Sequence, residues 1–224
     1  NNFIERWNYN GVNNDGEFFC INKDGDVLVL LERVGATTDY IIKTYNINED
    51  GSFSSRGNNI EGSDDTVTKN GYTANAKGFT VDYKNVSISL NDDGTILAVG
   101  LKDSYDDDNH AAGWIEPLGS VEIYKYNEST TNWDFKRTII GPPQPVGNVG
   151  RDGADFGTSV SLNGTGTRIA IGCPKWKKTP LHYPCGGGVY IYNTTDNWLA
   201  STTPIELQFS DVTIKYYGDV SSDP

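Results

Sequence analysis

The chain has 224 residues, of which 30 are acidic and 18 basic, so its formal net charge is −12. Phosphate binding requires a basic surface, so this balance argues against nucleic acid as a partner. No apolar run approaches the roughly 18 residues that a membrane-spanning helix needs, so no membrane span is expected.

The composition also predicts an all-β fold. The chain contains 25 Gly, 13 Tyr and 5 Trp, and no long segment places apolar residues at helical spacing. This mixture favours short strands joined by tight turns. Met is absent, including at position 1, from which we expect a processed product or a segment of a longer protein.

Three similar hairpins are predicted along the chain. The first is FFCINKDGDVLVLL (18–31), the second VSISLNDDGTILAVG (86–100) and the third DFGTSVSLNGTGTRIAIGCP (155–174). Asn22, Asn91 and Asn163 take the same place in each, so the period is roughly 70 residues. Asp24-Gly25 and Asp93-Gly94 are strong two-residue turn signals.

Each hairpin is followed by a strand rich in Tyr and β-branched residues, at 39–47, 119–127 and 187–193. A fourth strand is expected to begin near Phe53, Trp133 and Trp198. Repeated units of four strands are typical of radial β architectures, in which stacked copies bury each other's faces. The predicted fold is therefore a β-propeller-like array of four-stranded antiparallel blades.

The period divides the chain into predicted segments. Residues 1–16 are predicted to be the end of a preceding repeat. Three blade-like repeats follow at 17–78, 79–150 and 151–216, and residues 217–224 are predicted to begin a further repeat.

The third unit resembles the FG-GAP repeat of the integrin-α-type β-propeller family. Phe156-Gly157 stands at the FG position, and Gly172-Cys173-Pro174 stands at GAP with Cys in place of Ala. The second unit keeps Gly100 but lacks FG, and Tyr217-Gly218 is expected to take the FG position of a further unit. The resemblance implies a closed ring of about seven blades, and three units are too few for that. We therefore expect part of a larger propeller, with a ring completed by other copies or an array that stays open as the alternatives.

Calcium is the one cofactor to consider, because family loops carry acids that bind it. Thr95 and Thr167 stand where acids would be expected, so these calcium loops are degenerate and the hairpins are predicted not to bind the ion. Six to eight oxygen ligands are needed. Two acidic groups are candidates for a metal site. The least depleted hairpin carries Asn22, Asp24 and Asp26. The densest acid cluster, for which a solvated loop is the alternative, carries Asp103, Asp106, Asp107 and Asp108.

The third unit contains a basic and aromatic loop in an otherwise acidic chain. Exposed aromatic rings beside cations often mark binding surfaces. The alternative is that the rings pack the loop onto its own blade. The candidate binding residues are Lys175, Trp176, Lys178, His182 and Tyr183.

Two features indicate an extracellular setting. Cys173 and Cys185 bracket a proline-rich loop whose mouth a disulfide would close, with two free thiols as the alternative. Cys20 alternates with apolar residues and is expected to be buried. Four N-x-[ST] sequons predict glycosylation of Asn85, Asn127, Asn163 and Asn193.

Catalysis has little support in the sequence. Only His110 and His182 are present, and no G-x-S-x-G, P-loop or H-E-x-x-H motif occurs. We expect a non-enzymatic binding or adhesion module, extracellular or on a cell or virion surface, that recognises a protein or a glycan. The first alternative is a structural component of a surface layer or virion, with further copies as partners. The second is a propeller-type enzyme acting on polysaccharide.

Overall fold

A computed structural model describes residues 19–33, 40–61, 66–69, 72–75, 86–102, 119–141, 155–175, 187–194, 198 and 205–208. These residues form antiparallel strands and no helix, which confirms the predicted all-β class. Among them there is no helix long and apolar enough to cross a bilayer.

The strands make three four-stranded antiparallel sheets, each in simple sequence order. The first sheet contains β1 (Phe19–Ile21), β2 (Val27–Arg33), β3 (Tyr40–Ile47) and β4 (Phe53–Ser55). The second contains β7 (Val86–Leu90), β8 (Ile96–Leu101), β9 (Ser120–Asn127) and β10 (Asn132–Ile140). The third contains β11 (Ser159–Leu162), β12 (Arg168–Cys173), β13 (Gly188–Asn193) and β14 (Ile205–Gln208).

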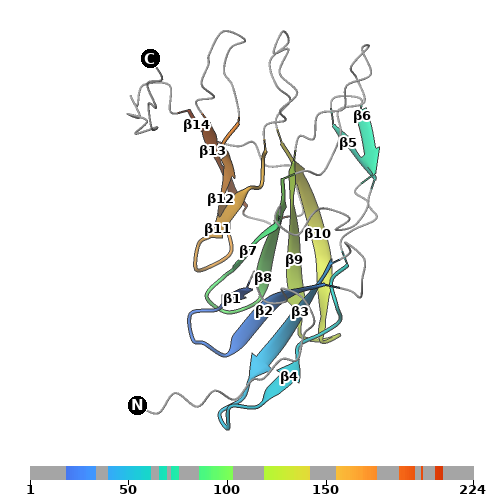
Figure 1. Cartoon of the computed structure of the whole chain (residues 1–224), viewed down its shortest axis with the longest axis vertical. Helices are drawn as coiled ribbons and strands as arrows, with labels where there is room; N and C mark the ends of the chain where they lie inside the picture. Colours follow the sequence, from blue (N-terminus) through green and yellow to red (C-terminus); the bar gives the residue numbers. More distant parts are fainter. Residues whose placement is uncertain are drawn as a thin grey trace, which may run out of the picture.

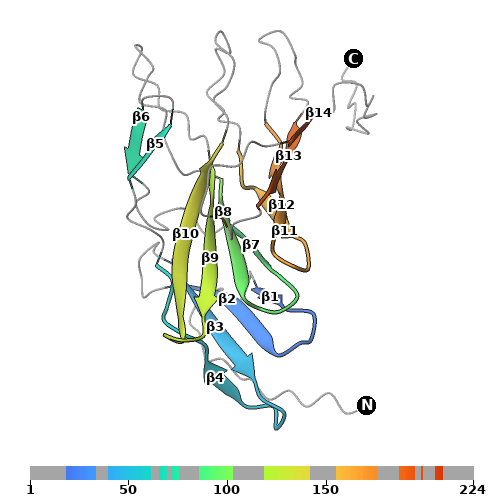
Figure 2. The ribbon, with the colours of Figure 1, turned by 180° about the vertical axis from the view of Figure 1, so that it is seen from behind.

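The second sheet lies between the other two (Figures 1 and 2). Its first strand, β7, contacts the first strands of both neighbours, β1 and β11. Each sheet falls within one predicted repeat, although the repeat boundaries themselves remain predictions. A separate two-stranded sheet, β5 (Thr66–Lys69) with β6 (Tyr72–Asn75), was not predicted from the sequence.

An asparagine at the same aligned position closes the first hairpin turn of each four-stranded sheet. The Oδ1 atom of Asn91 accepts the N–H groups of Thr95 and Ile96, both at 2.8 Å. Asn22 accepts the N–H of Val27 at 2.9 Å, and Asn163 accepts that of Arg168 at 2.8 Å. A side-chain amide in this place satisfies backbone donors that the turn would otherwise leave unpaired. The three aligned asparagines therefore occupy equivalent structural positions.

Two apolar cores fill the spaces between the sheets. The core between the first and second sheets includes Val29, Ile42, Leu97 and Val99. The other core, between the second and third sheets, includes Ala98, Ile123, Ile169 and Ile171. Leu97 and Ala98 are adjacent in β8 yet belong to different cores, because successive strand residues point to opposite faces. The second sheet is thus covered on both faces.

The fourth strands match the prediction at two of three positions. β4 begins at Phe53, and β10 begins one residue before Trp133. The expectation for Trp198 was wrong, because β14 begins only at Ile205. Trp198 has a φ of 70° and its indole N–H donates to the carbonyl of Gly166 at 2.8 Å. It is a buried anchor for the turn of its own sheet.

The Phe156-Gly157 pair joins the second and third sheets. Phe156 is fully buried in their shared core, where its ring packs edge-on against Tyr190. Gly157 has a φ of 92°, and its N–H donates to the carbonyl of Gly172 at 3.0 Å. A Cβ atom on Gly157 would lie 2.5 Å from the carbonyl oxygen of Ser120. Only glycine permits this close approach without strain.

Candidate functional site

A polar pocket of about 460 Å³ lies at the turn end of the second sheet, and we take it as the candidate site. One wall comes from the β7–β8 turn, and the others come from β9, β10 and the turn between them. Its lining residues are Thr95, Lys125, Tyr126, Asn127, Glu128, Asp134 and Lys136.

The β9–β10 hairpin brings the polar groups of the pocket together. Asp134 pairs directly with Lys125 across the two strands. Asn127 ends β9, and its Oδ1 atom accepts the backbone N–H of Ser129 at 3.1 Å, which fixes the start of the turn. Lys125 and Asn127 point to one face because they are two residues apart in a strand.

Asp134 is the centre of the polar network. Its Oδ2 atom accepts the Nδ2–H of Asn127 at 3.1 Å and lies 3.4 Å from the Nζ atom of Lys136. Both ionised groups keep solvent contact, so the ion pair contributes little to stability. These contacts hold the Asp134 carboxylate, the Asn127 amide and the Lys136 amine beside one opening.

Tyr126 supports the pocket from behind. Its ring packs against the core between the first and second sheets and edge-on to Trp133. The guanidinium of Arg56 lies 3.9 Å from the ring centroid, a cation–π contact, and donates to Asn46. With its ring held from the first sheet, Tyr126 is a rigid wall, and the chemistry available to a ligand comes from the polar groups.

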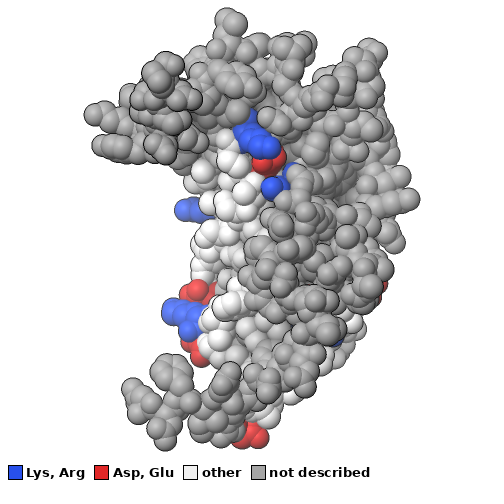
Figure 3. All heavy atoms as spheres, viewed as in Figure 1, with Lys and Arg blue, Asp and Glu red and all other residues white. Residues whose placement is uncertain are grey.

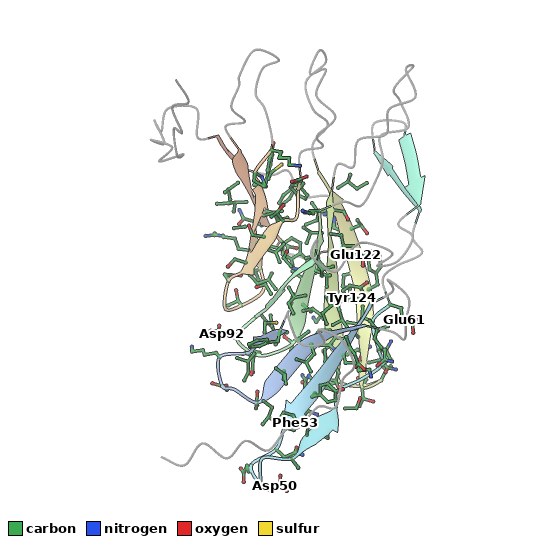
Figure 4. All side chains as sticks on the ribbon, viewed as in Figure 1. Asp50, Phe53, Glu61, Asp92, Glu122 and Tyr124 are labelled. Atoms are coloured by element: carbon green, nitrogen blue, oxygen red, sulfur yellow. The ribbon has the colours of Figure 1, made fainter. Side chains whose placement is uncertain are left out.

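A second titratable pair is buried. The hydroxyl of Tyr124 donates to Glu122 at 2.5 Å within β9 (Figure 4). Both side chains are almost fully buried. Since solvent does not reach the pair, we assign it to the packing of the sheet and not to catalysis.

The structure places one of the predicted binding-loop residues. The Nζ atom of Lys175 forms a 3.3 Å ion pair with Asp155, which directly precedes Phe156. Lys175 therefore ties the end of β12 to the segment that joins the two sheets. The other four, Trp176, Lys178, His182 and Tyr183, lie outside the described residues, so the binding loop remains a prediction.

The predicted metal groups also remain predictions. Asp103, Asp106, Asp107 and Asp108 lie outside the described residues. Asn22 uses its Oδ1 atom for the N–H groups of Asp26 and Val27 and its Nδ2 atom for Asp26. Across the described ranges no three His, Cys, Asp or Glu side chains form a group suited to a metal.

The cysteine and sequon predictions are only partly located. Cys173 is fully buried in the core between the second and third sheets, while Cys185 and Asn85 lie outside the described residues. Asn163 is exposed, whereas Asn127 and Asn193 are half-buried. Asn193 accepts a hydrogen bond from Arg168 Nε at 2.7 Å.

Sequence reasoning did not single out Asp134 or Lys136. The sequence NWDFKR (132–137) carries a signal for them, because charged residues alternate there with the aromatic residues of a strand. In the view of Figure 3, the charged groups of the described residues form small, scattered clusters of both signs.

The chain matches no protein-family model and no curated protein. Among solved structures it is similar to hydrazine synthase of Kuenenia stuttgartiensis, with 12% identity and a TM-score of 0.42, over 88% of this chain and 43% of that one. It is also similar to a eukaryotic initiation factor (13% identity, TM-score 0.27, 81% and 41% covered). A third similar structure is a prolyl endopeptidase, with 11% identity and a TM-score of 0.28, over 86% of this chain and 29% of that one. The chain spans less than half the length of each.

Proposed function

We propose that this chain is a non-enzymatic, extracellular or surface-displayed binding module, built as a propeller-like array of FG-GAP-like repeats, that recognises a glycan. The repeat architecture is supported by the equivalent turns of Asn22, Asn91 and Asn163 and by the two cores that join three successive sheets. A rigid scaffold of this kind leaves its loops and turn ends available for ligand contacts.

The observation that carries the binding proposal is the polar pocket around Asp134. An anionic ligand would meet Glu128 and Asp134 there, and a cationic ligand would meet Lys125 and Lys136. A neutral, polyhydroxylated ligand avoids both like-charge contacts. Its hydroxyl groups donate to carboxylates and accept from amines and amides, so the mixed lining suits it. We therefore favour a neutral oligosaccharide over a charged peptide.

The test is binding of the 224-residue chain to an array of neutral oligosaccharides, followed by titration of the strongest one. Loss of a hydrogen bond to a charged group costs about 1.5–3 kcal/mol, so Asp134→Ala should weaken binding about 10- to 100-fold. Glu49→Ala, which changes an exposed turn residue of the first sheet, is the matched control and should bind as the unaltered chain does. Binding that Asp134→Ala leaves unchanged, or no binding to any array member, contradicts the proposal.

Asn127 lies in this pocket and is also a predicted glycosylation site. A glycan attached to its Nδ2 atom would replace the contact with Asp134 and fill the opening. The two predictions therefore exclude each other at this residue. Mass spectrometry of the secreted chain distinguishes them, since pocket binding requires an unmodified Asn127.

A further inference from the structure

The first sheet exposes two large apolar residues on its first strand. Phe19 is 64% exposed and Ile21 is 50% exposed. The equivalent residues of β7, Ile88 and Leu90, pack into the core shared with the preceding sheet. The equivalent residues of β11, Val160 and Leu162, pack against the core between the second and third sheets. Phe19 and Ile21 therefore take the place of residues that, in the second and third sheets, pack against the preceding sheet.

The β1–β2 turn of the first sheet also differs from the equivalent turns of the other two sheets. A Cβ atom on Gly94 would lie 2.7 Å from Val27, and one on Gly166 would lie 2.7 Å from Ile96, so each turn sits tightly on the preceding sheet. For the equivalent Gly25 the nearest atom belongs to Ile21 of its own hairpin, at 3.9 Å. Among the described residues, no other sheet fills at Gly25 the space that one fills at Gly94 and Gly166.

The third sheet carries the complementary half. In the second sheet, the hydroxyl of Ser87 donates to the carbonyl of Gly157 at 2.8 Å, and the Oγ atom of Ser89 accepts the N–H of Leu162 at 2.9 Å. Both bonds reach forward to the next sheet. Ser159 and Ser161 take these positions in β11, and both are exposed.

We propose that a second copy of this chain covers these faces, with the third sheet of one copy docked on the first sheet of the other. The two faces complement each other and not themselves, so the contact is head-to-tail, and such contacts close into rings where the rotation allows. The described residues of each copy supply three four-stranded sheets, so two copies supply six of them, within the four to eight blades of closed propellers. The inference rests on the repeat architecture proposed above and is independent of the glycan pocket.

Charge complementarity supports a second copy as the occupant. Arg168 is exposed at the position that Val27 and Ile96 take in the earlier sheets, where each faces the next turn. Docked head-to-tail, Arg168 would face the turn of the first sheet, which carries the exposed Asp24 and Asp26. This junction is therefore expected to weaken as the salt concentration rises.

The experiment measures the mass of the full 224-residue chain in solution by light scattering across a concentration series. We expect a dimer that dissociates on dilution, and we expect Phe19→Asp and Ser161→Asp each to shift it to monomer. Thr130→Asp adds the same charge to the exposed β9–β10 turn and is the matched control. Thermal melting of the variants checks that they remain folded, since all three positions are exposed.

Mixing the two disruptive variants gives a sharper result. A mixed pair retains one unaltered junction, that between the third sheet of the Phe19→Asp chain and the first sheet of the Ser161→Asp chain. The mixture should therefore form dimer while each variant alone stays monomeric. A monomeric parent chain, or a dimer that neither variant changes, would overturn the proposal. Oligosaccharide binding, measured separately on the monomeric variants, shows whether the proposed function fails with it.

Discussion

The hydroxyl of Ser87 in the second sheet donates to the carbonyl of Gly157 at the entrance to the third. Gly157 in turn donates its N–H to Gly172 of its own sheet at 3.0 Å. One residue therefore links two sheets through its backbone, beside the fully buried Phe156. Sheet docking here depends on close backbone approach as well as on apolar packing.

Replacing Gly157 should destabilise the chain more than replacing Gly25. Both residues have positive φ, 92° and 75°, so alanine at either site bears a conformational cost of about 1–2 kcal/mol. At Gly157 the new Cβ atom also meets the carbonyl of Ser120 at 2.5 Å, whereas at Gly25 the nearest atom is 3.9 Å away. Urea denaturation of Gly157→Ala and Gly25→Ala, both in the Phe19→Asp background so that no second copy lies against Gly25, measures the difference. Equal losses of stability would show that the close approach does not matter.

Phe156→Ala should lower the free energy of unfolding by about 3–5 kcal/mol, the usual cost of removing a buried aromatic side chain. The ring is fully buried and contacts Tyr190 and Tyr192, so its removal leaves a cavity between the second and third sheets. Phe53→Ala, at a site 38% exposed, is the control and should cost clearly less. Similar costs for the two variants would place Phe156 outside the core.

The three turn asparagines should differ in importance. Asn91 is buried and its Oδ1 atom accepts two backbone N–H groups, so Asn91→Ala leaves two donors without that partner, at about 1–3 kcal/mol each. Asn163 is exposed, and water replaces its contact with Arg168 at little cost. Chemical denaturation should show a larger loss for Asn91→Ala than for Asn163→Ala. The reverse order would contradict this account of the turns.

Cys20 should react slowly with thiol reagents. Burial raises the pKa of its thiol to about 12, partly offset by a backbone hydrogen bond from Leu90. At pH 8 its thiolate fraction is then about 1,000-fold below that of an ordinary thiol, so alkylation should slow by a similar factor. Peptide mass spectrometry after timed alkylation measures this rate at Cys20, and labelling as fast as that of free cysteine would disprove the burial.

The same thiol gives a pH dependence with a definite sign. Between the ordinary pKa of 9.0 and about 12, the unfolded chain loses the Cys20 proton while the folded chain keeps it. Ionisation therefore favours the unfolded state, and stability should fall as pH rises through this window. Cys20→Ser, which does not ionise there, should show a shallower decline in thermal melts.

Local patterns in the sequence predict the all-β class and the equivalence of the three hairpins. Alternating apolar residues, glycine turns and the repeated Asn22, Asn91 and Asn163 are local signals, since strand pleat and turn geometry depend on neighbours in the chain. The start of β4 at Phe53 followed from the same kind of pattern.

Contacts between sheets depend on the folded arrangement, and local patterns do not predict which groups meet there. Ser87 and Gly157 are 70 residues apart, and no local pattern predicts their hydrogen bond. The place of Trp198 was missed because its indole N–H reaches the carbonyl of Gly166, a partner 32 residues away, and holds the residue in a turn. The pocket around Asp134 likewise depends on strand register, which the pairing of β9 with β10 sets.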